Sequence, residues 1–199
     1  MAKLFFTYAS MNVGKSTQLL QVAYNYNERG QNVLLYKPAF DTRTKDTIGS
    51  RIGIQRECRC VHVHENMFTL VETESKLQKI DCVLVDEVQF LTEKQIWELS
   101  DIVDKLGIPV MCYGLRTDFL GNLFPGSRAL LAIADETRQL PGICDCGRKT
   151  CMVARTDDNG NVIRRGEQIC IGAEQRYVSF CRKCWKEKLS YNWDQFKQT

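Results

Sequence analysis

The stretch Tyr8–Thr17, YASMNVGKST, lies between a short apolar run and a segment with helical periodicity. Its second half, Gly14-Lys15-Ser16, matches the end of the phosphate-binding pattern G-x-x-x-x-G-K-[ST], whereas Ala9 takes the place of the first glycine. A phosphate loop needs small residues, because backbone N–H groups and a helix N-terminus must approach the phosphate oxygens, and it needs a lysine that reaches the outer phosphates. Ala9 and Ser10 are small enough. The stretch therefore predicts a phosphate loop with Ser16 as a candidate magnesium ligand, and the alternative is a chance G-K-S before a helix.

The sequence around this loop alternates apolar runs with helical patterns. Four runs predict buried strands: KLFFTY, NVLLYKP, DCVLVDEVQF and IPVMCYGL, at residues 3–8, 32–38, 81–90 and 108–115. Helical spacing follows at 15–31 and at 92–107, where Thr92 is a candidate N-cap and Gly107 a candidate stop. This alternation predicts an α/β fold with a parallel sheet covered by helices on both faces, and ligands bind at the carboxyl ends of such strands.

Composition limits the class of protein. The 199 residues are 44% hydrophobic, which is enough for one complete core and a small appendage. The net charge is only +3 and no basic run exceeds two residues, so nucleic acid is not the expected partner. The first apolar cluster is too short for a signal peptide or a membrane span, and we expect a cytoplasmic chain without a membrane partner. In that compartment the ten cysteines are expected to be thiols or metal ligands.

Two close cysteine pairs predict a zinc site. The sequence changes character at LPGICDCG, and we expect a nucleotide-binding domain over 1–140 and a zinc-binding lobe over 141–199. The candidate ligands are Cys144 and Cys146 in a C-x-C pair, and Cys181 and Cys184 in a C-x2-C pair. Such a closed site would fold the lobe and do no chemistry. There are two alternatives: Cys151 or Cys170 takes the place of one of these ligands, or the four thiols bind no metal.

Two carboxylates end the third predicted strand. Asp86 occupies the place where nucleotide-binding folds hold magnesium, and Glu87 follows it. One carboxylate can join the metal shell while the other accepts a proton from an attacking hydroxyl or water. The alternatives are that Glu87 is a solvated charge at the strand end, or that it activates water in an ATPase.

Three further segments are less specific. CRCVHVH at 58–64 would place two cysteines and two histidines on one strand face, but a flat row cannot converge on one tetrahedral ion, so we favour an ordinary strand over a soft-metal site. The segments 40–57 and 116–127 are expected to be loops or a projecting hairpin near the site. Ile171-Gly172 and Tyr177 offer a close backbone approach and an aromatic ring to a flat ligand.

Taken together, MNVGKST, DTR, VDEVQF, YGLRTDF, CDCG and IGAEQRYVSFCRKC resemble the zinc-containing thymidine kinases, the bacterial branch especially. The resemblance implies a RecA-like P-loop domain, a zinc lobe with a lasso-like loop over the nucleoside, and a homotetramer. It implies transfer of the γ-phosphoryl group of Mg-ATP to the 5'-hydroxyl of thymidine, with deoxyuridine as a further acceptor, to give dTMP for nucleotide salvage.

The resemblance also assigns roles to residues of this sequence. Glu87 matches the general base, and the four cysteines of the two pairs match the zinc ligands, although the C-x-C pair is shorter than in many members. ATP and magnesium would be held by Ala9, Ser10, Met11, Asn12, Val13, Gly14, Lys15, Ser16, Asp41, Arg43, Asp86 and Gln89. The nucleoside would be held by Met11, Phe90, Leu115, Phe119, Phe124, Ile169, Cys170, Ile171, Gly172, Ala173 and Tyr177.

Two other classes of protein share some of these motifs. A P-loop ATPase with a zinc knuckle for single-stranded nucleic acid would use Lys15 and Glu87 to activate water, but the near-neutral charge and the absence of interleaved basic and aromatic runs argue against it. A regulatory nucleotide sensor is disfavoured by the paired carboxylates.

Overall fold

The structure is a computed structural model that describes residues 1–39, 46–157, 159–168 and 176–190. The contacts divide the chain into two compact units. Unit 1 comprises Met1–Tyr8, Gly14–Arg116 and Phe124–Leu140, and unit 2 comprises Ala9–Val13, Thr117–Leu123 and Pro141–Thr199. The division of the chain into domains at residue 140 stays a prediction.

Unit 1 is built on a six-stranded sheet in which every strand pair is parallel. Its strands are β1 (Leu4–Tyr8), β2 (Val33–Pro38), β5 (Arg59–Val61), β6 (Cys82–Val85), β7 (Val110–Gly114) and β8 (Glu136–Gln139), in the order β5-β2-β6-β7-β1-β8. This confirms the predicted α/β class with a parallel sheet. Because β1, β7 and β6 are neighbours, the segments that leave their carboxyl ends emerge at one edge of the sheet.

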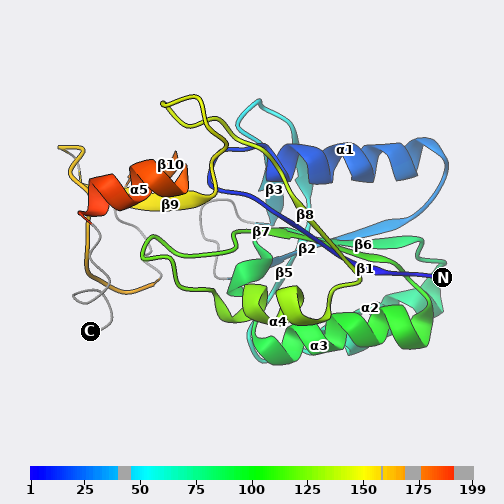
Figure 1. The fold of residues 1–199 in the computed structure, drawn as a ribbon. Helices are drawn as coiled ribbons and strands as arrows, with labels where there is room; N and C mark the ends of the chain where they lie inside the picture. The colour runs from blue at the N-terminus through cyan, green and yellow to red at the C-terminus, as the bar shows by residue number, and fades with distance from the viewer. Residues whose placement is uncertain (40–45, 158, 169–175, 191–199) are drawn as a thin grey trace. The chain divides into compact units, whose positions relative to one another are not determined.

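Helices cover both faces of this sheet. They are α1 (Lys15–Glu28), α2 (Met67–Leu77), α3 (Glu93–Asp101) and α4 (Pro125–Ile133), and Figure 1 shows α1 on one face and the other three on the opposite face. The predicted cap Thr92 is confirmed, since its hydroxyl accepts from the Gln95 N–H in a capping box. α3 passes into a π-helical turn, η2 (Ile102–Leu106), and Gly107 ends it with a φ of 68°. The helices α2 and α4 and the edge strand β8 were not expected from the sequence.

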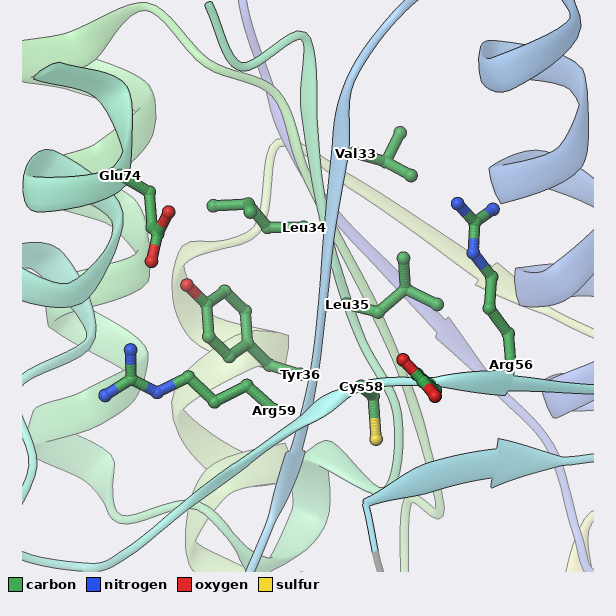
Figure 2. A pocket seen from close by; sticks show the side chains of 9 residues that line it. Val33, Leu34, Leu35, Tyr36, Arg56, Cys58, Arg59 and Glu74 are labelled. Carbon is green, nitrogen blue, oxygen red and sulfur yellow. The ribbon is translucent and has the colours of Figure 1, made fainter. Parts of the chain in front are cut away.

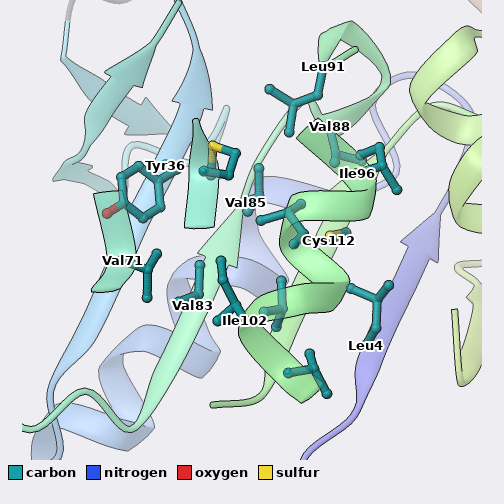
Figure 3. Packing of buried hydrophobic residues seen from close by; sticks show 14 of the residues in the cluster. Leu4, Tyr36, Val71, Val83, Val85, Val88, Leu91, Ile96, Ile102 and Cys112 are labelled. Atoms are coloured by element: carbon teal, nitrogen blue, oxygen red, sulfur yellow. The ribbon is translucent and has the colours of Figure 1, made fainter. Parts of the chain in front are cut away.

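The alternation of side chains along the buried strands produces two cores. In β6, Val83 and Val85 point to the face covered by α2, α3 and α4, where Figure 3 shows them packed with Ile96 and Ile102. Cys82 and Leu84 point to the other face and pack against leucines of α1. A continuous apolar run is therefore needed in this strand, because both of its faces are buried.

Two smaller antiparallel strand pairs are separate from the six-stranded sheet. In unit 1, β3 (Thr47–Gly49) and β4 (Gln55–Glu57) form an antiparallel hairpin in the segment expected to project. In unit 2, β9 (Met152–Thr156) pairs antiparallel with β10 (Arg176–Phe180), and α5 (Arg182–Leu189) follows. No helix among the described residues is both long and apolar enough to cross a bilayer.

The strand expected over 58–64 is shorter than predicted. It is confined to β5, and the rings of His62 and His64 stack beyond its end with centroids 5.5 Å apart. Within the part of the chain that the structure describes, one group of three or more potential metal ligands comes together, and it is the four cysteines of the predicted zinc site. The cysteines and histidines of 58–64 form no such group there.

Candidate active site

The helix α1 begins at Lys15, the lysine of the predicted phosphate loop. Gly14 caps the helix with a φ of 81°, a left-handed conformation that glycine adopts without strain, and its carbonyl oxygen accepts from the Gln18 N–H at 2.9 Å. Lys15 is buried, with 7% of its surface exposed. The first turn carries no acidic side chain, so the positive end of the helix dipole is not neutralised from within the helix. These features suit an anion-binding helix end.

Ser16 and Asp86 form a hydrogen-bonded pair in unit 1. The Ser16 hydroxyl donates to Asp86 Oδ2 at 2.7 Å, and the backbone N–H of Glu87 donates to Asp86 Oδ1 at 3.0 Å. The pKa of Asp86 is raised to about 7, first by burial and then by the Glu87 charge, although the Ser16 hydroxyl and the Lys15 charge act to lower it. A hydroxyl and a carboxylate oxygen side by side are the donors that Mg²⁺ prefers, so this pair fits the predicted magnesium ligands.

Glu87 turns the chain sharply after β6. Its φ of 49° and ψ of 36° are left-handed, which is uncommon for a residue with a side chain, and the turn starts the short 3-10 helix η1 (Val88–Phe90). Glu87 is half-buried, and its Oε2 accepts a hydrogen bond from Gln89 Nε2 at 2.6 Å. It is thus a carboxylate with a defined orientation, which the sequence alone left open.

The predicted base-pocket residues of unit 1 include an aromatic pair. The rings of Phe90 and Phe124 meet edge to face, with centroids 5.8 Å apart and planes at 79°. Phe124 is 4% exposed and Leu115 is 8% exposed, so both are largely buried. The structure thus brings Phe90 and Phe124 together.

In unit 2 the first half of the predicted phosphate loop is held by hydrogen bonds. The hydroxyls of Ser10 and Thr150 lie 2.8 Å apart, and the Ser179 hydroxyl donates to the Met11 carbonyl oxygen at 2.8 Å. Asn12 is left-handed, with a φ of 62°. Contacts with residues more than a hundred positions away therefore shape this half of the loop.

Phe119, another predicted pocket residue, is covered by an arginine that the sequence did not single out. Arg155 is 3% exposed, and its guanidinium carbon lies 3.8 Å from the centroid of the Phe119 ring. It donates to the carbonyl oxygens of Glu167 and Arg165 at 3.1 and 3.4 Å. In the sequence, Arg155 could have been noticed as the single positively charged residue of the strand β9, which is otherwise buried.

The four predicted zinc ligands come together in unit 2. The Sγ atoms of Cys144, Cys146, Cys181 and Cys184 all lie within 4.8 Å of one another, and Cys151 is not among them. A tetrahedral ion with Zn–S bonds of about 2.3 Å needs sulfurs about 3.8 Å apart. The Sγ atoms of Cys146 and Cys181 are 3.6 Å apart, so the short C-x-C spacing is compatible with such a site. The backbone N–H of Cys184 and the neighbouring thiols lower the pKa of Cys181 to about 6, whereas hydrogen bonds with Cys146 and Cys181 raise the pKa of Cys184 to about 12.

Several predicted residues lie outside those that the structure describes. They are Asp41 and Arg43 of DTR and the lasso residues Ile169, Cys170, Ile171, Gly172 and Ala173. Tyr177 is described and lies half-buried on β10. Lys37, which the sequence reading did not name, is buried on β2 and donates to the Thr47 carbonyl oxygen at 3.1 Å.

A separate cavity of about 700 Å³ lies beside the first half of β2. Figure 2 shows Arg56 and Arg59 extending to opposite sides of the strand, with Cys58 between them, so the two cations do not converge on one ligand. Burial raises the pKa of Cys58 to about 12, which keeps this thiol protonated and unreactive. None of the predicted site residues lines this cavity.

Three features place the chain in the class of P-loop nucleotide-binding proteins. They are an all-parallel α/β sheet, a G-K-S turn at the start of α1, and a hydrogen-bonded Ser16–Asp86 pair at the carboxyl ends of the strands. Comparison with known proteins is more specific. The family model described as thymidine kinase matches residues 2–185. A thymidine kinase of Idiomarina loihiensis is 55% identical over 190 residues, covering 95% of this chain and 98% of that protein. A thymidine kinase of Rhizobium meliloti is 52% identical over 95% of this chain and 98% of its own length. A thymidine kinase of Vibrio vulnificus is 48% identical over 95% of this chain and 99% of its own length. The chain belongs to the thymidine kinase family, and the resemblance seen in the sequence is confirmed.

Proposed function

We propose that this chain transfers the γ-phosphoryl group of ATP to the 5'-hydroxyl of thymidine. Membership of the thymidine kinase family makes it an ATP-dependent nucleoside kinase, a transferase with a small-molecule substrate. The observation that carries the mechanism is the carboxylate arrangement after β6, where Asp86 bonds to Ser16 and Glu87 is held by Gln89. Two carboxylates in different settings suit two different tasks.

Glu87 is the proposed general base. A base must lie within hydrogen-bond reach of the hydroxyl that it deprotonates, and Glu87 follows a strand end at the edge of the sheet where ligands of parallel α/β folds bind. It accepts the proton of the 5'-hydroxyl as the oxygen attacks the γ-phosphorus, and ADP leaves. After the transfer the proton is on Glu87 and the phosphoryl group is on the 5'-oxygen of the product dTMP.

The phosphate-binding residues neutralise charge. Lys15 and the N-terminus of α1 are proposed to bind the phosphates, together with the other loop residues from Ala9 to Ser16. Ser16 and Asp86 are proposed to hold Mg²⁺, which when bound offsets phosphate charge. Contacts of Gln89, Asp41 and Arg43 with the nucleotide also stay predictions, and so does binding of thymidine by the predicted pocket and lasso residues.

Zinc in the cysteine cluster is proposed as a structural ion. Four thiolates leave no open coordination position, so the ion would fold unit 2 and take no part in phosphoryl transfer. A homotetramer in the cytoplasm, with neither nucleic acid nor membrane as partner, and acceptance of deoxyuridine also remain proposals.

The test measures ATP consumption with thymidine, deoxyuridine, uridine, a short oligonucleotide or no acceptor, with mass spectrometry of the product. We expect thymidine-dependent formation of dTMP. Release of ADP and phosphate without a nucleoside, or only with the oligonucleotide, would instead support an ATPase.

The variant Glu87→Gln tests the base. We expect kcat to fall by roughly 100- to 10,000-fold with ATP binding nearly intact, because a positioned base contributes about that much to a rate. Turnover close to that of the unaltered chain would remove Glu87 from the role.

A further inference from the structure

Gln89 is buried, and both ends of its side-chain amide are hydrogen-bonded. It is 1% exposed, its Oε1 accepts the Leu115 N–H at 2.9 Å, and its Nε2 donates to Glu87 Oε2 at 2.6 Å. A backbone N–H can only donate, so the amide oxygen must face Leu115 and the NH₂ group must face Glu87. The orientation of the amide therefore follows from the chemistry of its neighbours.

Two glycines make room for Gln89 and for the backbone beside it. A Cβ atom on Gly114, the last residue of β7, would lie 2.5 Å from Gln89 Oε1 and 2.9 Å from Val88 Cγ1. On the other side, a Cβ atom on Gly126 of α4 would lie 2.7 Å from the Val88 carbonyl oxygen. The 3-10 helix η1 is thus packed between two glycines, and the amide of Gln89 fills the space that the missing Cβ of Gly114 leaves.

A hydrogen bond to one carboxylate oxygen restricts the rotation of the group, and with it the direction of the other oxygen. Glu87 also stands on a left-handed backbone, so its side chain leaves the chain in a direction that an ordinary turn would not give. A base displaced by about 1 Å can lose about 100-fold in rate, which makes such an anchor effective.

We propose that Gln89 is a positioning residue for the phosphoryl transfer: it orients the Glu87 carboxylate, and Gly114 is required for it to do so. Gln89 does this through its hydrogen bond to Glu87. The nucleotide contact predicted for Gln89 from the sequence stays a prediction. The proposal rests on the proposed function of Glu87 as the base.

The test compares two buried glutamines. Gln89→Glu keeps an acceptor for the Leu115 N–H but replaces the donor to Glu87 with a like charge. Gln95→Glu is the matched control, because Gln95 is 2% exposed, donates to the His62 and Glu65 carbonyl oxygens, and has no role in the proposed site. At pH 8 we expect Gln89→Glu to lower kcat 10- to 100-fold with the KM values for ATP and thymidine changed less than threefold. We expect Gln95→Glu to keep kcat per folded chain within threefold.

A double-mutant cycle separates a positioning role from a merely structural one. If Gln89 acts through Glu87, then adding Gln89→Glu to Glu87→Ala should change the residual kcat less than threefold. Gly114→Ala, which displaces an unaltered Gln89, should reproduce the loss of kcat. A full 10-fold further loss in the Glu87→Ala background, or a raised KM for ATP in place of a lowered kcat, would overturn the proposal.

Hydrogen exchange of the Gln89 side-chain NH₂ tests the contact without any turnover. We expect this exchange to be slow in the unaltered chain and at least 10-fold faster in Glu87→Ala. If the unaltered chain made no dTMP, the proposed function would fail by that measurement alone. Equal exchange rates in both chains would instead refute the anchoring of Glu87 by Gln89.

Discussion

Replacing Asp86 by asparagine should stabilise the ligand-free chain at neutral pH while it removes activity. Asp86 is 4% exposed, and burial is the main reason that its pKa rises from 3.8 to about 7. Asparagine has the same shape and can keep both hydrogen bonds. Its oxygen can accept the Glu87 N–H, and its NH₂ group can donate to the Ser16 hydroxyl, which rotates to accept.

The sign and size of the effect follow from proton linkage. Below pH 3.8 the carboxyl is protonated in both the folded and the unfolded chain, so it has no effect on stability. Between pH 3.8 and about 7 the unfolded chain loses this proton while the folded chain keeps it, so the free energy of unfolding falls by about 1.4 kcal/mol per pH unit. Above pH 7 the loss is constant at roughly 4 kcal/mol. Between pH 5 and pH 8, the stability of Asp86→Asn relative to the unaltered chain should therefore rise by about 2 to 3 kcal/mol.

The assay is urea denaturation at pH 5 and pH 8, followed by circular dichroism. Mg²⁺ and ATP are left out because they would bind the ionised carboxylate, and no chelator is added so that the zinc proposed for the cysteine cluster is not removed. Asp104→Asn is the matched control, since it removes the same charge from an exposed position on η2. A stability difference for Asp86→Asn that stays the same at both pH values would refute the reasoning. Full phosphoryl transfer by this variant would refute the proposed magnesium role.

Two further substitutions test unit 2. Cys184→Ser removes one of the four proposed zinc ligands, so we expect metal analysis to find that the zinc is lost. We also expect hydrogen exchange to become fast in β9 and β10 before it does so in the sheet of unit 1. A variant that still binds one zinc per chain would contradict the site. Gly166→Ala should destabilise the chain by about 1 to 3 kcal/mol, because Gly166 has a φ of 133° and an added Cβ would overlap the Arg155 guanidinium. Gly160→Ala is its control, with a φ of 81° and open space around the added atom, and thermal unfolding of the two variants should separate steric overlap from backbone strain. Equal losses in both would mean that contact with Arg155 has no effect.

The features of this protein that the sequence by itself determined are local ones. The helix that starts at Lys15, the helix cap at Thr92 and the buried apolar run from Cys82 to Val85 each depend on residues within a few positions of one another. Their patterns are therefore visible before folding, because caps, turns and apolar periodicity act over one or two turns of chain. The order of the motifs was specific enough to identify the thymidine kinase family, which the comparisons confirm.

Only the tertiary structure decided which of these residues meet. Ser16 and Asp86 are 70 positions apart, and Gln89 and Leu115 are 26 positions apart, yet each pair is hydrogen-bonded. The physical reason is that such contacts depend on the order of the strands, which places β6 beside β7, and on a glycine at the end of β7 that admits a neighbouring side chain. A one-dimensional pattern reports which face of an element is buried, but the partner on that face is chosen by packing of the whole chain.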